Sequence, residues 1–293
     1  MALTFKKLHQ HFAGEVSPVD LRQVHDPVTL EQIRAGMDEF AVLVFRNQPF
    51  AHEDQLAFTQ RFDGALHTKS ATAALMGKNR FGYAGGLSDI SNVNAEGEIV
   101  GPDDRRRQSM ATNQLWHTDA SFQDPRGRYS MLSCKTIPPV RADTEFADMR
   151  AAYDALDAET KASLEGLRAH HSVAYTKQLL GFELTQKEKD SLKGAVQPLV
   201  LTIPSSQRRS LYIAAHISHI IDWPVPRGRL LVRDLTEHAT QPQFVYRHAW
   251  RVNDFVIWDN RGTMHRGRPF DDTKYRRELV RTTTLDLPLP TAA

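Results

Sequence analysis

The sequence predicts an α+β protein with a double-stranded β-helix (jelly roll) or related β-sandwich core, helices packed outside it and a long active-site lid loop. Three observations lead to this prediction. Many short apolar, β-branched runs are spaced along the chain, a few segments of helical period lie between them, and a glycine-rich stretch over 64–111 has room for short strands only. No internal repeat or linker-like boundary divides the 293 residues. We therefore expect one domain over 1–293, long enough to bury a sizeable core.

The chain before Gly64 predicts a helix, a strand and a second helix. Asp26-Pro27 provides an N-cap followed by a first-turn proline, and apolar residues then recur at helical spacing at Leu30, Ile33, Met37 and Phe40. The run 41–45 is short, apolar and β-rich, which favours a buried strand. After the turn at 47–49 we expect a second helix, whose apolar positions are Leu56, Phe58 and Phe62.

The stretch over 64–111 contains many glycines and polar residues, with short strands expected near Ile90 and Val93. Loops of this length in a compact domain are usually functional lids or disordered segments. Because the stretch runs directly into the segment with His117, we interpret it as a lid. A mobile insertion without a role is the alternative.

The rest of the chain predicts further strands separated by helices. Asp148 and Asp157 each occupy an N-cap position before a helical apolar pattern, the first reaching Leu156 and the second Leu167. A third helix is expected from Gly228 to Ala239. Strands are predicted over 130–137, 144–147, 199–203, 211–214, 255–258 and 279–285.

Charge and cysteine content exclude several classes of function. The 37 basic and 35 acidic side chains give a net charge of +2, so there is no electrostatic case for nucleic acid or an anionic membrane as partner. Cys134 is the single cysteine and lies in an apolar run, which indicates a buried, reduced thiol and a cytoplasmic location. We expect neither a secretion signal nor a membrane span, because no apolar run is long enough.

A possible metal clamp lies in the segment Leu115-Trp116-His117-Thr118-Asp119. In an extended strand, side chains two residues apart project to the same side, so His117 and Asp119 would offer an imidazole nitrogen and a carboxylate oxygen together. One further histidine would complete a facial triad, which leaves three adjacent metal positions open. By itself the pattern is common, and a surface histidine beside a solvated aspartate is the alternative. His265, expected at the start of a strand after the turn at 260–262, is the candidate third ligand.

A pair of arginines follows in the strand predicted near the C-terminus. If the segment is extended, Arg277, Leu279 and Arg281 share one face and Glu278 points the other way. Two buried arginines without acidic partners would be very costly, so carboxylates of ligands are their expected counter-ions. The alternative is an exposed edge strand with solvated arginines.

With these residues together, the chain resembles the family of iron(II)- and 2-oxoglutarate-dependent dioxygenases that includes taurine dioxygenase and 2,4-dichlorophenoxyacetate dioxygenase. The resemblance covers nearly the whole chain and is closest to the aryloxyalkanoate-degrading branch. It is carried by NQLWHTDASF over 113–122, TEFADMRAAY over 144–153, EHATQ over 237–241, and WDNR over 258–261 leading to His265 and Arg277. The 64–86 segment follows the herbicide enzyme poorly, which leaves the substrate open.

The resemblance implies a role for each matching residue. His117, Asp119 and His265 match the Fe(II) ligands. Thr144 and Arg277 match the residues that hold the distal carboxylate of the cosubstrate 2-oxoglutarate. The candidate substrate-binding residues are Arg281, for the acidic group, Asn113 and His216. His216 also forms a His-x-x-His pair with His219, which we interpret as structural or substrate-side because no third ligand is near in sequence.

The reaction implied by the resemblance uses O2 to hydroxylate an aryloxyalkanoate such as 2,4-dichlorophenoxyacetate, with ether cleavage to a phenol and glyoxylate and with succinate and CO2 as coproducts. The expected partner is a small carboxylate with an aromatic body, and a homo-oligomer is expected. Taurine or another alkylsulfonate and a phenylpropanoid acid are the alternative substrates. A non-catalytic metal-dependent sensor on the same scaffold would need no site for 2-oxoglutarate.

Overall fold

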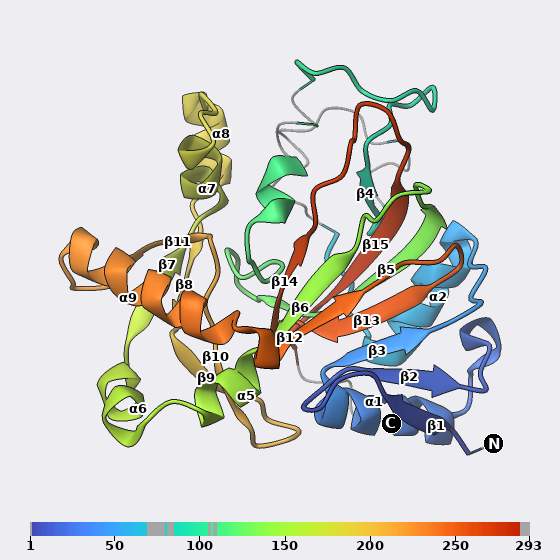
Figure 1. The fold of residues 1–293 in the computed structure, drawn as a ribbon, viewed down its shortest axis with the longest axis horizontal. Helices are drawn as coiled ribbons and strands as arrows, with labels where there is room; N and C mark the ends of the chain where they lie inside the picture. Colours follow the sequence, from blue (N-terminus) through green and yellow to red (C-terminus); the bar gives the residue numbers. More distant parts are fainter. Residues whose placement is uncertain (1, 69–79, 81–84, 105–106, 108–109, 288–293) are drawn as a thin grey trace.

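The computed structural model describes residues 2–68, 80, 85–104, 107 and 110–287 (Figure 1). Much of the lid predicted from the sequence, over 69–79, 81–84, 105–106 and 108–109, lies outside the described residues.

The largest sheet has seven strands, which lie on the right of Figure 1. Its neighbours pair antiparallel except for one parallel pair, β2 with β3. In spatial order the strands are β1 (Thr4–Lys7), β2 (Gly14–Ser17), β3 (Val42–Phe45), β13 (Phe255–Asp259), β5 (Gly127–Thr136), β15 (Glu278–Leu285) and β4 (Ser88–Ser91).

A three-stranded antiparallel sheet lies beside the large one and closes the jelly roll. It consists of β12 (Val245–His248), β6 (Thr144–Asp148) and β14 (Thr263–Gly267). Phe146 of β6 packs in one buried cluster with Val256 and Trp258 of β13 and with Leu279 of β15, so this cluster fills the space between the two sheets. The α+β class and the jelly-roll core predicted from the sequence are confirmed.

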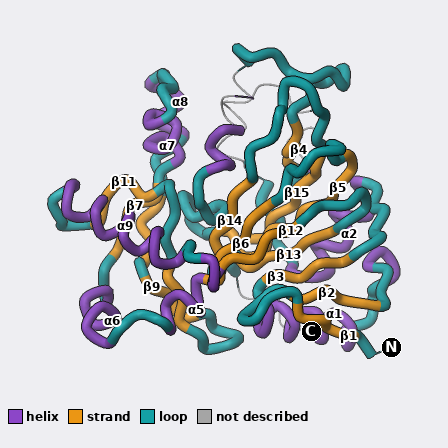
Figure 2. The backbone as a smooth tube through the Cα atoms, viewed as in Figure 1, coloured by secondary structure: helices purple, strands orange, loops and turns teal. Residues whose placement is uncertain are grey.

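Two helices cover the outer face of the large sheet: α1 (Pro27–Phe40) and α2 (His52–Asp63) (Figures 1 and 2). The predicted cap is present, because the Asp26 side chain accepts from the Thr29 N–H. Side chains alternate along β13: Phe255 and Ile257 pack with the helices, whereas Val256 and Trp258 point into the jelly roll. This strand therefore ties the outer helical core to the inner one.

The remaining elements form a second group, on the left of Figure 1, that packs on the other face of the small sheet. Its helices are α5 (Met149–Asp154), α6 (Ala158–Leu164), α7 (Val173–Leu179), α8 (Gln186–Ser191) and α9 (Val225–Ala239). Its strands are β7 (Arg168–His171), β8 (Ala195–Pro198), β9 (Val200–Thr202), β10 (Arg209–Leu211) and β11 (Ile217–Ile220). Single turns of 3-10 helix occur at η1 (Leu21–Gln23), η3 (Ala111–Gln114) and η4 (Pro242–Phe244).

Several predicted boundaries differ from those observed. The helix predicted from Gly228 begins at Val225, because Pro226 fits the first turn, where no backbone donor is needed. The strand predicted over 211–214 ends at Leu211, since the chain then leaves its partner strand and Ala215 N–H donates to the Trp116 carbonyl. The helix capped by Asp157 ends at Leu164, short of Leu167.

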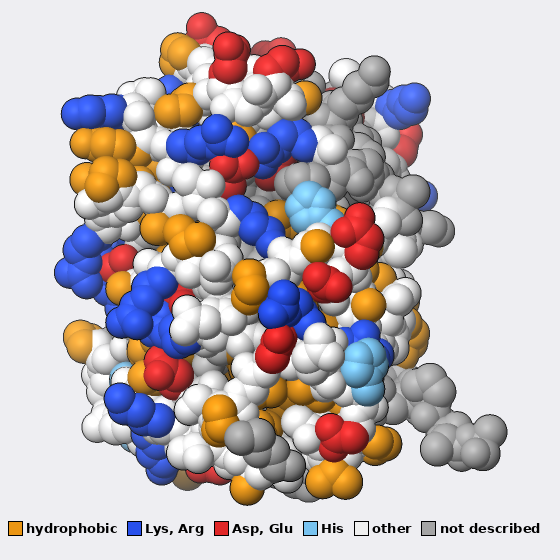
Figure 3. Space-filling view, turned by 90° about the vertical axis from the view of Figure 1, so that its right-hand side faces the viewer, with side chains coloured by type: hydrophobic (Ala, Val, Ile, Leu, Met, Phe, Trp, Pro, Cys, Tyr) orange, Lys and Arg blue, Asp and Glu red, His pale blue; other side chains and the backbone are white. Residues whose placement is uncertain are grey.

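Charged side chains are mixed on the molecular surface that Figure 3 shows, with positive and negative groups interspersed. This distribution agrees with the small net charge of the sequence. Among the helices that the structure describes, none is long and apolar enough to cross a membrane. Cys134 is buried as predicted, and burial raises the pKa of its thiol to about 12.

Candidate metal centre and adjoining cavities

The three predicted metal ligands lie together although they come from distant parts of the sequence. His117 and His265 form an isolated antiparallel bridge in which each backbone N–H donates to the carbonyl of the other residue, at 3.0 and 2.8 Å. Asp119 follows in a turn rather than in the extended strand that the sequence predicted. The turn still directs its carboxylate to the side of both imidazoles.

The candidate ligand atoms have the separation and the protonation state that a metal ion needs. The Nε2 atoms of His117 and His265 lie 4.0 and 3.8 Å from the two carboxylate oxygens of Asp119. Neither distance exceeds the sum of two metal–ligand bonds of roughly 2.0–2.2 Å each, so one ion can contact both atoms of each pair. Burial lowers the pKa of both histidines, so their rings are neutral at pH 7 and each offers a nitrogen lone pair. His117 Nδ1 bonds to the Leu115 carbonyl at 2.7 Å, which turns Nε2 towards Asp119.

The carboxylate of Asp119 is held from two sides. Ser130 Oγ donates to Oδ2 at 2.7 Å, and Arg281 Nη1 donates to Oδ1 at 2.5 Å. Burial opposes ionisation of Asp119, but Arg281 and the two imidazoles outweigh this effect and hold its pKa well below the usual range. Asp119 is therefore deprotonated, as a metal-binding carboxylate must be.

Asn260 connects this carboxylate to the rest of the fold. Its side-chain oxygen accepts from the Asp119 backbone N–H at 3.1 Å and from the Trp258 indole at 3.1 Å. Its amide nitrogen donates to Ser130 Oγ at 3.0 Å. The hydrogen bonds thus run from Asn260 through Ser130 to the carboxylate and fix its orientation.

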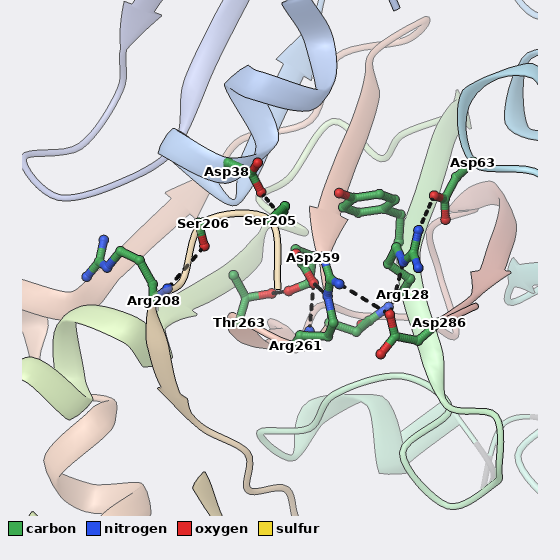
Figure 4. A network of polar contacts seen from close by, with 12 residues as sticks. Asp38, Asp63, Arg128, Ser205, Ser206, Arg208, Asp259, Arg261, Thr263 and Asp286 are labelled. Atoms are coloured by element: carbon green, nitrogen blue, oxygen red, sulfur yellow. Dashed lines mark hydrogen bonds and ion pairs between the residues drawn. The ribbon is translucent and has the colours of Figure 1, made fainter. Parts of the chain in front are cut away.

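An ionic network anchors the turn that carries Asn260 (Figure 4). The buried Arg261 guanidinium forms ion pairs with Asp259 at 2.7 Å and with Asp286 at 3.2 Å. Arg128 then joins Asp286 to Asp63, at 3.0 and 2.7 Å. Because every charge in this network has an opposite partner, it can hold the turn rigidly without leaving an uncompensated buried ion.

Replacing Ser130 by alanine tests whether this second layer acts on the metal site. We expect Ser130→Ala to lower the affinity for Fe(II) roughly 10–100-fold, because outer-shell hydrogen bonds to a ligand orient it. Ser133→Ala is the matched control: Ser133 is equally buried in β5 but donates to Gln55, on the helical side of the sheet. Metal titrations of both variants give the answer, and equal affinities would refute the role of Ser130.

The first cavity opens beside the triad and has a volume of about 390 Å³. His117, His265, Thr144, Arg277 and Arg281 all line it. No acidic side chain among the described residues forms an ion pair with Arg277, and its Nε is buried without a hydrogen-bond partner. Burial lowers the pKa of Arg277 to about 10, which leaves it charged at pH 7. The cavity thus presents a buried cation that needs an anion.

Thr144 adds a hydroxyl group to the wall of this cavity. Trp250, which the sequence did not indicate as a site residue, orients that hydroxyl group. Trp250 donates from its indole nitrogen to Thr144 Oγ1 at 2.9 Å. Since this bond uses a lone pair of the hydroxyl group, the Thr144 proton remains available for an acceptor in the cavity. No local pattern in the sequence signals the role of Trp250.

The second cavity is smaller and adjoins the first, because His117 and Arg281 line both. Asp119, Arg281, Asn113 and His216 line it, and Asn113 lines the first cavity as well. His216 Nδ1 bonds to Thr176 Oγ1 at 3.0 Å, and its ring contacts that of His117 with centroids 5.8 Å apart. His219 lines neither cavity and bonds to Ser218. The structure therefore separates the two members of the His-x-x-His pair.

The structure corrects one expectation about Arg277 and Arg281 and excludes the alternative of an exposed edge strand. The expectation that neither arginine has an acidic partner is wrong for Arg281, whose partner is Asp119, because the turn at 119 brings that carboxylate to β15. Glu278 points away as expected and pairs with Arg80 and Arg276. The edge-strand alternative is wrong, since β15 lies between β5 and β4.

Comparisons with known proteins agree with this site. The family model described as taurine catabolism dioxygenase TauD, TfdA family, matches residues 4–283. The alpha-ketoglutarate-dependent 2,4-dichlorophenoxyacetate dioxygenase of Cupriavidus pinatubonensis is 45% identical over 287 residues, covering 98% of this chain and 99% of that protein. The (S)-phenoxypropionate/alpha-ketoglutarate-dioxygenase of Sphingobium herbicidovorans is 32% identical over 285 residues, covering 94% of this chain and 92% of that protein.

A solved structure is also similar to this chain over its whole length. The crystal structure of AAD-2 in complex with Mn(II) and N-oxalylglycine has a TM-score of 0.88 and 41% identity, and the match covers 100% of both chains. N-oxalylglycine is an analogue of 2-oxoglutarate. The chain belongs to the TauD/TfdA family of 2-oxoglutarate-dependent dioxygenases.

Proposed function

We propose that this protein is an Fe(II)- and 2-oxoglutarate-dependent dioxygenase that hydroxylates an aryloxyalkanoate such as 2,4-dichlorophenoxyacetate. The printed activities of the two relatives and the geometry of the two cavities support this proposal. The products are a phenol and glyoxylate from the substrate, and succinate and CO2 from the cosubstrate.

His117, Asp119 and His265 are assigned to the metal. Two neutral imidazoles and one carboxylate on one side of an ion are the donor set typical of non-haem Fe(II) oxygenases, with further positions left open. His265 Nδ1 is buried and has no hydrogen-bond partner among the described residues, and the ring packs against Trp258 and Phe146 with centroids 4.8 and 6.0 Å away. All three ligand atoms lie within 4.8 Å of one another.

Arg277 and Thr144 are assigned to 2-oxoglutarate. This cosubstrate carries two carboxylates. The one remote from the metal would meet the Arg277 guanidinium, which has no ion-pair partner among the described residues, and the hydroxyl proton of Thr144, which lines the same cavity. A guanidinium binds a carboxylate in a forked geometry, which fixes orientation as well as position.

Arg281 is assigned to the acidic group of the substrate, with Asn113 and His216 beside it. Its Nη1 holds Asp119, and its Nε is buried without a partner among the described residues. The guanidinium therefore keeps a donor for a second carboxylate while it supports the metal ligand. A substrate carboxylate held there would place the neighbouring carbon close to the metal centre.

The chemistry of the bound iron and 2-oxoglutarate is to supply the oxidant, with consumption of O2, that hydroxylates the carbon next to the ether oxygen. The hydroxylated product is a hemiacetal, which breaks down to the phenol and glyoxylate. The chain needs no nucleophile for this breakdown. Its residues bind and orient the two acids so that their reacting ends meet at one point.

The 64–111 stretch is assigned to an active-site lid within a single domain. Ile90 and Met110 line both cavities, and Pro102 lines the first. Arg107 also pairs with Asp272 at 2.8 Å beside the first cavity. These contacts support the proposal that described parts of the stretch form a wall of the substrate site.

The observation that carries the proposal is that the buried Arg277, which has no acidic partner in the described part of the chain, lines the same cavity as His117 and His265 of the triad. A metal-dependent sensor would have no use for this cation. The test is a panel of phenoxyacetate, both 2-phenoxypropionate enantiomers, a phenylpropanoid acid and taurine, with succinate and phenol measured. We expect phenol release from the aryloxy acids, and a clear preference for taurine would overturn the proposed substrate class.

Replacing Arg281 should separate the two acid sites. We expect Arg281→Ala to raise the KM for the aryloxyalkanoate about 10–100-fold, because a charge-assisted hydrogen bond is lost. The KM for 2-oxoglutarate should stay within about twofold of the wild-type value. Arg266→Ala is the control, because Arg266 pairs with Glu145 and lines neither cavity. Steady-state kinetics with each substrate varied in turn measures both constants. An equal rise in both would show that the assignment is wrong.

A further inference from the structure

His67 is a histidine on the wall of the second cavity to which none of the roles above is assigned. Its Nε2 is buried and has no hydrogen-bond partner within the described part of the chain. Buried polar atoms without a partner are rare in folded proteins, because each costs the desolvation of the group. A ligand in the cavity is one way to satisfy this atom.

The backbone fixes where His67 lies. The segment 65–67 continues the pairing of the large sheet along β15: Leu285 N–H donates to the Ala65 carbonyl at 2.9 Å, and His67 N–H donates to the Thr283 carbonyl at 2.8 Å. Thr283 is two residues beyond Arg281 and lines the same cavity. His67 is therefore held next to the strand that presents Arg281, on the wall of the same cavity.

The chemical state of His67 suits a hydrogen bond to an anion. Burial lowers the pKa of His67, so the ring is neutral at pH 7. The side chain of Gln123 acts against burial and raises the pKa of His67. An amide side chain can donate or accept, so Gln123 can bond an unprotonated Nδ1 while Nε2 carries the proton.

The surroundings of His67 point to the acidic end of the substrate rather than to its ring. Arg281 and Asp119 line the same cavity as His67. Arg281 already shares its guanidinium with Asp119. The Arg281 guanidinium would have to bind the carboxylate of Asp119 and that of the substrate. The substrate carboxylate can therefore accept from a second donor.

We propose that His67 is a specificity-determining residue that donates from Nε2 to the acidic group of the substrate, beside Arg281. This inference rests on the proposed function, because it concerns the same substrate cavity. A neutral donor next to a guanidinium favours a planar carboxylate with two oxygens to bind, and it disfavours an uncharged amide in the same place.

The test compares His67→Leu, which removes the donor, with His67→Gln, which keeps an N–H donor at a similar distance from the backbone. We expect His67→Leu to raise the KM for phenoxyacetate about 10-fold or more, because a hydrogen bond to a charged group is lost. The kcat and the KM for 2-oxoglutarate should stay within about twofold of the wild-type values. His67→Gln should recover most of the loss. His219→Leu is the control, since His219 lines neither cavity.

The outcomes separate this inference from the proposed function. If the wild-type protein releases no phenol from any aryloxy acid, both are wrong. If the wild type is active and His67→Leu has the wild-type KM, only the role of His67 is wrong. A loss in kcat and in both KM values that His67→Gln does not recover would mark His67 as structural and would also overturn the inference.

Discussion

A His117→Ala variant should have less than about one hundredth of the wild-type turnover, because even the loss of an outer-shell partner of a metal ligand costs 10–100-fold. The variant keeps Asp119 and His265 but has lost one of the three candidate metal ligands. It should also reduce the affinity for Fe(II), since two ligands hold an ion less tightly than three. Fe(II)-dependent succinate formation and metal titration measure the two effects.

The control for this prediction is His219→Ala, which removes a histidine of the same sequence neighbourhood as His216 but outside both cavities. It should keep the wild-type rate and metal affinity within about twofold, as is usual for a substitution away from special features. A His117→Ala enzyme that kept more than about a tenth of the wild-type rate at saturating Fe(II) would contradict its assignment as a ligand.

Arg277→Leu should separate binding from stability. We expect the KM for 2-oxoglutarate to rise about 100-fold, because a buried charge pair with the cosubstrate is lost. The melting temperature without ligands should not fall, since the variant removes a buried cation that has no ion-pair partner among the described residues. A hydrophobic side chain in such a place is often neutral or stabilising.

Arg150→Leu is the matched control for Arg277→Leu. Arg150 is also buried, but it pairs with Asp148 at 2.9 Å and lines neither cavity. Its loss leaves Asp148 as an uncompensated buried charge, so we expect a large fall in melting temperature and an unchanged KM for 2-oxoglutarate in the folded protein. Thermal melts of both variants measure the change in melting temperature, and steady-state kinetics measures the KM for 2-oxoglutarate. A destabilised Arg277→Leu with a normal KM would contradict the cosubstrate role.

Local patterns in the sequence predicted most of the elements that surround the site. The apolar run before Asp259 is β13, the run containing Leu279 is β15, and the cap at Asp148 begins α5. These predictions hold because hydrophobic period and capping are properties of neighbouring residues. The structure also brings together the three candidate ligands, and Thr144 and Arg277 line one cavity with two of them.

The contacts that could not be predicted are those made across the fold. Ser130 and Asn260 are far apart in the sequence, and only the pairing of β5 with β13 brings them to Asp119. A small polar residue in the otherwise apolar run 129–132 was the available signal for Ser130. The partner of Arg281 was predicted wrongly for the same reason, since strand alternation describes one strand and not the turn that approaches it.

The backbone bridge between His117 and His265 has a consequence for how this protein melts. The bridge joins two segments separated by more than half of the chain, so it forms only when the long intervening chain has closed. An ion held by side chains of both segments binds the native state and not the open chain, which raises the free energy of unfolding with the logarithm of the metal concentration. The metal centre thus acts as a reversible cross-link, and heat or a chelator should release both ends of it together.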